Sequence, residues 1–250
     1  VPDIPGVCGI VDGSVLPGCL AIEAGQSAVG DLFLWFAAQL TPDAFGSTPG
    51  AKLDALDRAA AALAPGASGL LALDWNNGNR TILADARLSG LLLGQTLHTT
   101  APEVHRALVE ATAFGARMII DRVRAYGIPV EQVVTCGGLA VKSPLLMQIY
   151  ADVLELPLVI AASDQTCALG AALFGAVAAG AFPSAAAAQQ RLCRVRDLTY
   201  QPNPASVAVY RELLTLYRQL HDGFGTPAWN GSMSAVMKRL IAIREARRSR

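Results

Sequence analysis

Hydrophobic residues near the start of the chain fall into short runs followed by a longer periodic segment. Two apolar stretches, residues 6–11 and 16–22, are separated by Asp-Gly-Ser and predict two short strands joined by a turn. Apolar positions then recur at helical spacing over residues 28–40, and Ser27 is suited to cap that helix. The chain therefore opens with strands that lead into a helix.

A second group of segments follows the same alternation. An alanine-rich helix is predicted over residues 51–63, and a buried strand over residues 70–73. The clearest helix spans residues 101–126, where Thr100 and Glu103 form a capping box and the apolar positions make one face. This long helix is expected to pack against the strands on that face.

Strand and helix also alternate in the middle of the chain. The predicted order is a strand at 133–136, a helix at 144–154, a strand at 158–161 and a helix at 165–179. Such alternation is typical of βαβ units, so we expect a sheet that is at least partly parallel.

The pattern changes after residue 182. A polar connection leads to two amphipathic helices, over residues 204–220 and 232–244. We therefore predict an α/β domain over residues 1–182 and a C-terminal helical extension over residues 183–250 that packs on it.

The composition is that of a globular protein and argues against two functional classes. Apolar residues make up 52% of the 250 positions, which is ample for a packed core. The formal net charge is zero and most basic residues are scattered, which argues against a nucleic-acid-binding surface. The longest uncharged apolar run, residues 167–182, falls short of the roughly 20 residues of a membrane span. We interpret this run as a buried helix.

The cysteines and the first residues indicate the compartment. Five cysteines are widely separated and lack metal-binding spacing, so we expect reduced, buried and inert thiols. The three histidines are also far apart and are interpreted as structural. The first residues have neither the basic start nor the apolar core of a signal peptide, which predicts a cytoplasmic protein. Because the chain begins in mid-pattern without Met, we expect a fragment.

One candidate binding turn lies between the second strand and the first helix. Gly25 removes a side chain where a ligand could approach the backbone, Ser27 is placed to cap the helix, and Glu23 stands just before the turn. A helix N-terminus offers free N–H groups that favour an anion such as phosphate. On the residues alone, an ordinary turn with a surface ion pair at Glu23 stays an open alternative.

A second candidate turn follows the strand at 133–136. Gly137 and Gly138 allow close approach and a positive φ, Lys142 adds a positive charge, and Ser143 can cap the next helix. The turn matches neither a P-loop nor the dinucleotide glycine pattern. Steric relief by the two glycines is the alternative interpretation.

Several long strings resemble the L-ribulokinases of the FGGY family of sugar kinases. They cover nearly the whole chain in the right order. The strings are LAIEAGQSAVGD at 20–31, ALDWNNGNR at 72–80, EATAFGAR at 110–117, CGGLAVKSPLLMQIYAD at 136–152, ALGAA at 168–172 and YRQLHDGFG at 217–225.

This resemblance implies both a fold and an activity. The family fold is a pair of actin-like ATPase (ribonuclease H-like) domains, and this chain is similar to the second: an α/β domain with a mixed sheet flanked by helices, plus a C-terminal helical extension. The implied activity of the intact protein is transfer of the γ-phosphoryl group of ATP to L-ribulose, in L-arabinose catabolism, with Mg2+. A membrane or nucleic-acid partner is not expected, and homo-oligomerisation is left open.

The resemblance also assigns roles to residues of the two turns. Gly25 and Gly138, with the adjoining Gly137, match glycines that lie against the nucleotide phosphates. Lys142 falls where related glycerol kinases place an adenosine-contacting Asn. Glu23 matches the residue that binds the sugar hydroxyls.

The sequence departs from the family at the catalytic base. The family's catalytic Asp and its phosphate loop precede the first residue of this chain, so no catalytic residue and no metal ligand is assigned, and the missing N-terminal kinase domain is the expected partner. We predict that the chain alone is inactive. The alternatives are a non-catalytic nucleotide-binding or interaction module, and a kinase for another ketopentose or pentitol. Residues 75–80 are predicted to form a loop on the cleft side.

Overall fold

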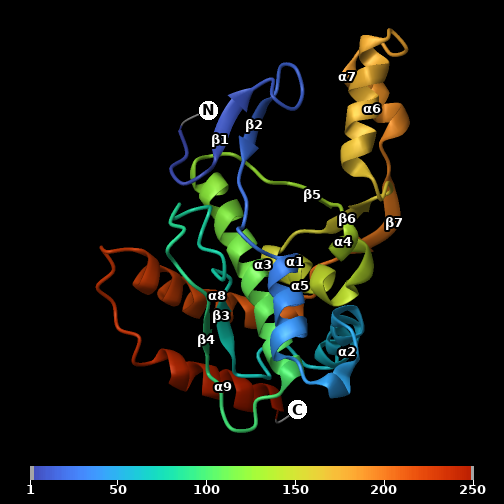
Figure 1. Ribbon diagram of the computed structural model, residues 1–250. Helices are drawn as coiled ribbons and strands as arrows, with labels where there is room; N and C mark the ends of the chain where they lie inside the picture. Colours follow the sequence, from blue (N-terminus) through green and yellow to red (C-terminus); the bar gives the residue numbers. More distant parts are fainter. Residues whose placement is uncertain (1–2, 249–250) are drawn as a thin grey trace.

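The computed structural model describes residues 3–248, and a β-hairpin opens this part of the chain (Figure 1). Strands β1 (Gly9–Asp12) and β2 (Leu20–Glu23) pair antiparallel, with Gly9 opposite Glu23. The predicted strand pair is confirmed. The connection is longer than predicted, because residues 13–19 all lie outside the strands.

The first helices follow the hairpin but do not begin where predicted. The elements are α1 (Gly30–Trp35), a π-helical turn (Phe36–Leu40), a short 3-10 helix (Asp43–Phe45) and α2 (Pro49–Ala61). Helix α1 begins at Gly30, and its N-cap residue, Val29, makes no side-chain hydrogen bond. The predicted cap at Ser27 is therefore wrong, because an irregular segment separates that residue from the helix.

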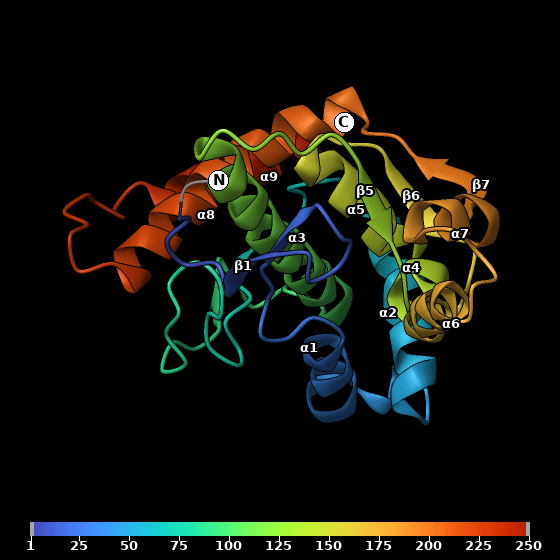
Figure 2. The same ribbon diagram turned by 90° about the horizontal axis from the view of Figure 1, so that it is seen from above.

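Helix α3 (Ala101–Ala125) runs through the middle of the molecule (Figure 2). The predicted capping box is confirmed, since the Glu103 carboxylate accepts a 2.8 Å hydrogen bond from the Thr100 N–H. A single apolar face was predicted, but the first half of the helix is buried all round, polar residues included. The cause is that α1, α2, α5 and β3 all pack against it.

The strands within residues 3–248 form three small sheets. Beside the hairpin, β3 (Leu71–Leu73) pairs antiparallel with β4 (Leu91–Leu93); in the third sheet, β6 (Leu158–Ala161) lies between β5 (Val133–Thr135) and β7 (Val195–Tyr200). The β5–β6 pair is parallel and the β6–β7 pair is antiparallel, so the expected mixed sheet is present. Strand β7 belongs to the segment predicted as a helical extension, whose division from the first domain stays a prediction.

The remaining helices lie in the second half of the chain. They are α4 (Gly138–Lys142), α5 (Pro144–Leu154), α6 (Thr166–Ala178), α7 (Ala185–Leu192), α8 (Pro204–Gly225) and α9 (Val236–Arg248). Helices α6 and α7 pack on each other and stand out from the body of the molecule (Figure 1). No helix in residues 3–248 is long and apolar enough to cross a membrane.

Two burial predictions are wrong. Leu173 is the one buried residue of α6, although the segment was interpreted as a buried helix. All five cysteines are exposed rather than buried. The physical reason is that apolar composition measures a tendency to be buried, whereas burial itself requires a packing partner.

The core joins α3, α8 and β3 around large aromatic side chains. Trp75, Tyr210 and Tyr217 are each at most 2% exposed, and the Phe114 ring of α3 packs on both tyrosine rings. The C-terminal helix α8 is therefore part of the same core as the central helix.

Glu155, directly after α5, is held by two arginines. It accepts a 3.1 Å hydrogen bond from Arg117 Nη1 and further hydrogen bonds from Arg211. Hydrogen bonding by Arg211, reinforced by Arg117, lowers the pKa of Glu155 from 4.5 to about 2. A lowered folded-state pKa means that this carboxylate stabilises the fold above about pH 4.5, and that the stabilisation is lost as pH falls towards 2.

Replacing Glu155 with Gln should lower the free energy of unfolding by about 1 kcal/mol at pH 7. The difference from the unmodified chain should narrow as pH falls from 4.5 towards 2, because there the native carboxylate also becomes protonated. Urea unfolding at pH 7 and pH 2.5 measures both values. The exposed Glu131→Gln change is the control, and a difference that is independent of pH would contradict the ion-pair explanation.

Candidate functional site

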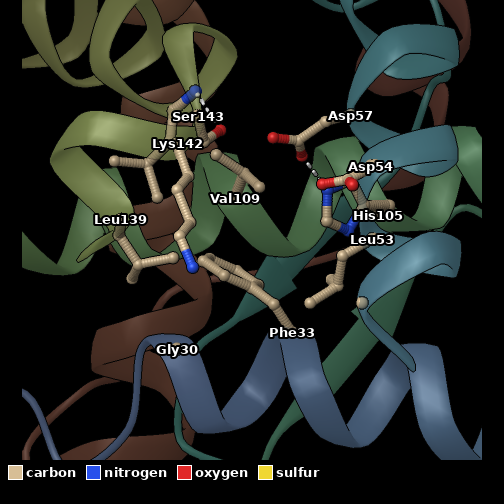
Figure 3. A pocket seen from close by; sticks show the side chains of 12 residues that line it. Gly30, Phe33, Leu53, Asp54, Asp57, His105, Val109, Leu139, Lys142 and Ser143 are labelled. Atoms are coloured by element: carbon tan, nitrogen blue, oxygen red, sulfur yellow. Dashed lines mark hydrogen bonds and ion pairs between the residues drawn. The ribbon is translucent and has the colours of Figure 1, made fainter. Parts of the chain in front are cut away.

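A cavity of about 450 Å3 lies between α1, α2 and α4, with α3 at its base (Figure 3). Its size falls within the range of small-molecule sites. The walls are largely apolar: Phe33, Leu53, Val109, Leu139 and Leu146. Such walls suit the flat, weakly polar face of an aromatic ring system.

Polar side chains of opposite charge face each other across this cavity. Lys142 of α4 extends towards Phe33 on one side, and Asp54 and Asp57 of α2 lie on the other (Figure 3). His105 Nε2 lies 2.6 Å from Asp57 Oδ1, and the His105 ring is 1% exposed. Its Nδ1 is buried without a hydrogen-bond partner in the part of the chain that the structure describes. The cavity can therefore meet both acceptors and donors on a ligand.

The Gly137–Gly138 turn opens helix α4 beside this cavity. Gly137 has φ +87°, and a Cβ on either glycine would meet nothing within 4 Å. The next residue, Leu139, lines the cavity. A short helix α4, missed from the sequence, separates the turn from α5, while the predicted cap is confirmed because Ser143 Oγ accepts from Leu146 N–H at 3.1 Å. The turn thus leaves open backbone next to the cavity mouth.

A second, polar hollow of about 490 Å3 lies along the loop after β3. Gln26, Ser27, Asn77, Asn79 and Arg80 line it together with two alanines. We call this hollow the polar groove. Its amides, hydroxyl and guanidinium offer hydrogen bonds of the kind that a polyhydroxylated ligand needs.

The other turn predicted from the sequence borders this groove. Glu23 Oε1 lies 2.5 Å from Arg80 Nη2, and the Gly25 N–H donates to Thr81 Oγ1 at 3.1 Å. The predicted placement of Gly25 at a helix N-terminus is wrong, because α1 begins at Gly30 and the Gly25 N–H is already engaged. The loop at residues 75–80 contacts this segment through Asn77 and Arg80, while its predicted place on the cleft side stays a prediction.

The structure therefore separates the predicted residues into two groups. Lys142 lines the cavity, and Gly137 and Gly138 adjoin it. Glu23 contacts Arg80 of the polar groove, and Gly25 directly precedes Gln26, which also lines that groove. The groups are linked because Gly30, a few residues beyond Ser27, lines the cavity, and a Cβ there would lie 3.4 Å from Leu139 Cδ1.

Sequence reasoning missed the opposite wall of the cavity. Asp57 on α2 and His105 on α3 are 48 positions apart, and the alanine-rich pattern around Asp57 indicates only a surface helix. His105 was interpreted as structural. A signal existed only in its position on the buried stretch of a long helix, where a polar side chain needs a partner.

Comparison with known families identifies the chain. Residues 1–179 match the C-terminal domain model of the FGGY family of carbohydrate kinases. The chain belongs to this family. Within FGGY kinases, it is 48% identical to the ribulokinase of Halalkalibacterium halodurans over 250 residues, covering 97% of this chain and 44% of that protein. It is 44% identical to the ribulokinase of Mycolicibacterium smegmatis, covering 97% and 42%. The chain thus spans less than half the length of these FGGY relatives.

Solved FGGY structures confirm the predicted α/β fold class. The xylulose kinase from Rhodospirillum rubrum superposes with a TM-score of 0.69 at 31% identity, covering 84% of this chain and 41% of that one. The glycerol kinase of Plasmodium falciparum, solved with ADP, gives a TM-score of 0.66 over 82% of this chain at 16% identity, which shows the fold alone. The chain therefore has the actin-like ATPase fold of FGGY kinases.

Proposed function

We propose that this chain is the nucleotide-binding half of an ATP-dependent sugar kinase, and that the intact protein transfers the γ-phosphoryl group of ATP to L-ribulose in the cytoplasm. Family membership and the names of the ribulokinase relatives support the reaction. The observation that carries the proposal is the apolar cavity beside the open Gly137–Gly138 turn, with Lys142 across its mouth.

The nucleoside of ATP would occupy this cavity. Phe33 and Leu139 offer apolar surface for the base, and burial of that surface supplies most of the affinity. The phosphates would leave the cavity past Gly138, where no side chain blocks the backbone. Lys142 would hold the nucleotide by its positive charge near the exit.

The sugar would bind on the side of the polar groove. Glu23 stands at the end of β2, and its carboxylate can accept hydrogen bonds from vicinal hydroxyl groups. Because residues 23–30 run from the groove to the cavity, a sugar hydroxyl and the γ-phosphoryl group can meet along this segment. Orientation of two bound reactants accounts for a large part of such catalysis.

Two elements of the reaction would come from outside this chain. The N-terminal kinase domain would supply the Asp that accepts the hydroxyl proton. Residues 3–248 contain no group of three or more His, Cys, Asp or Glu side chains that could hold a metal ion, so they offer no complete metal site of their own. Mg2+ is commonly held by phosphates and one or two carboxylates, and would enter with ATP.

Titration of the chain with ADP should produce saturable amide shifts at Leu139 and Lys142. Without the opposing domain we expect a dissociation constant on the order of millimolar, equivalent to about 4 kcal/mol. Replacing Gly138 with Val should abolish these shifts, because the isopropyl group fills the open space beside the cavity.

Gly175→Val is the matched control for this titration. Gly175 also lies in a helix with open space around it, but in α6, away from the cavity. This variant should bind ADP like the unmodified chain. Shifts centred outside α1, α2 and α4, or binding that survives in Gly138→Val, would contradict the proposed site.

A further inference from the structure

The segment 23–27 is held along its length by the segment 74–81. Every residue of the first segment except Ala24 is bonded to the second, although the partners are 48 to 57 positions apart in sequence. The pairs are Glu23 with Arg80 at 2.5 Å, Gly25 N–H with Thr81 at 3.1 Å, Gln26 with Asp74 at 2.6 Å, and the Ser27 carbonyl with Asn77 at 3.4 Å. We call the segment 74–81 the clamp loop.

The clamp loop is itself fixed in place. Asp74 is 5% exposed and also accepts a 2.9 Å hydrogen bond from the hydroxyl of Tyr217. Trp75 is buried, and Asn79 Oδ1 accepts from the N–H groups of Ile82 and Leu83 at 2.9 and 3.0 Å. A loop anchored at both ends can transmit its geometry to the residues it holds.

The Arg80–Glu23 pair lies at the open end of this arrangement. The two side chains are 53% and 69% exposed, so the pair contributes only about 0.2 to 1 kcal/mol to stability. The main effect of the pair is on the orientation of the Glu23 side chain. Without a partner, a glutamate side chain samples several rotamers, and fixing it in one of them is an entropy cost that binding would otherwise bear.

We propose that Arg80 is a positioning residue, which holds the Glu23 carboxylate in the orientation that receives a polyhydroxylated substrate. The inference rests on the proposed role of Glu23 in sugar binding. Arg80 Nη1 lies 3.7 Å from the Cβ position of Gly25, so the guanidinium stays at the turn and lines the polar groove beside the carboxylate. Arg80 acts through Glu23, and its loss affects the sugar and not the nucleotide.

A double-mutant cycle in the full-length kinase that carries this domain tests the inference. Arg80→Gln should lower kcat/KM for L-ribulose about tenfold, leave the KM for ATP unchanged, and leave the melting temperature within a degree or two. Arg80→Lys should recover part of the loss, because it keeps the charge but not the fork of donors. The double variant Arg80→Gln, Glu23→Gln should be no worse than Glu23→Gln alone.

Arg87→Gln is the matched control, because Arg87 pairs with Asp85 near the same loop and is 92% exposed. This variant should behave like the unmodified enzyme. If the losses of Arg80→Gln and Glu23→Gln multiply, or if Arg80→Gln has normal sugar kinetics while Glu23→Gln is impaired, Arg80 does not act through Glu23. If the Glu23→Gln variant binds sugar normally, Glu23 does not bind the sugar, and the proposed role of Arg80 is wrong as well.

Discussion

The 250-residue chain on its own should release no ADP from Mg-ATP when L-ribulose is added. A sugar kinase needs a carboxylate that accepts the hydroxyl proton while both substrates are held in line. The chain spans 44% of its ribulokinase relative and would offer only one wall of such a site. A coupled ADP-release assay should therefore show no rate above that of ATP alone.

Three carboxylates near the proposed substrate regions already have partners, so they do not offer a free base. Glu23 pairs with Arg80, and Asp57 lies against His105 at the far side of the cavity. Burial raises the pKa of Asp74, and hydrogen bonds from Gln26 and Tyr217 offset part of this effect. Because Asp74 is buried and hydrogen-bonded to Gln26 and Tyr217, it fixes the position of Gln26 and is not accessible as a base for a sugar hydroxyl.

Two additions sharpen the assay. Adding a separately produced N-terminal kinase domain should restore sugar-dependent turnover if the two halves associate. Comparing the rates with D-xylulose and with L-ribulose distinguishes an L-ribulose kinase from a kinase for another ketopentose. Sugar-dependent ADP release by the purified chain alone, unchanged by Glu23→Gln, would contradict the assignment of these residues.

Replacing Arg106 with Met should lower the free energy of unfolding at pH 7 by about 3 to 5 kcal/mol. Arg106 donates to Glu110 at 2.8 Å, to the Ala60 carbonyl at 2.9 Å and to the Tyr210 hydroxyl at 2.9 Å. The side chains of Arg106 and Glu110 are 5% and 3% exposed. Removing the cation therefore leaves a buried, uncompensated carboxylate, and urea unfolding measures the cost.

The deficit should depend on pH in a defined direction. Burial raises the pKa of Glu110 above its ordinary value of 4.5, and Arg106 opposes this shift. In the Arg106→Met variant, the pKa of Glu110 is therefore raised further. A raised folded-state pKa favours the fold at low pH and opposes it as pH rises. The stability deficit of the Arg106→Met variant relative to the unmodified chain should therefore shrink as the pH falls from 7 to 5.

Two further variants separate charge from packing. The exposed change Arg87→Met should shift stability by less than about 0.5 kcal/mol. Arg106→Met combined with Glu110→Leu should recover part of the loss, because the orphaned charge is gone while the Tyr210 hydroxyl stays unpaired. Equal losses in the single and the combined variant would show that packing, not the buried charge, sets the cost.

Much of the fold could be predicted because local signals are strong where helices begin and where strands are short and apolar. The Thr100–Glu103 cap, the helix at 144–154 and the strand at 158–161 are found where the pattern indicates them. Strand β7 was missed because Val-Arg-Asp-Leu-Thr-Tyr lacks a continuous apolar face, and its partner β6 lies far back in the chain. Pairing of that kind is set by tertiary structure, which local patterns do not record.

The candidate site could be predicted only in part, for the same reason. Glycine in a strand-to-helix turn is visible in the sequence, and the open Gly137–Gly138 turn bears this out geometrically. The contacts of Glu23 with Arg80 and of Asp57 with His105 join residues about 50 positions apart. Arg80 cannot be identified as the partner of Glu23, nor His105 as the partner of Asp57, without knowing which elements pack together.

The burial of the first half of α3 has a consequence for the spacing of the two proposed ligand regions. Val109 lines the cavity, and about 1.7 turns further along, Gly115 lies against Gln26 and Asp74, since a Cβ there would lie 2.6 Å from both side chains. The two points are separated by roughly 9 Å of helix rise. Helix α3 thus fixes the distance between the two regions proposed for the nucleotide and the sugar. An insertion or deletion of one residue between Val109 and Gly115 would rotate one end by about 100° against the other and lose the register. This stretch is therefore expected to tolerate no change in length.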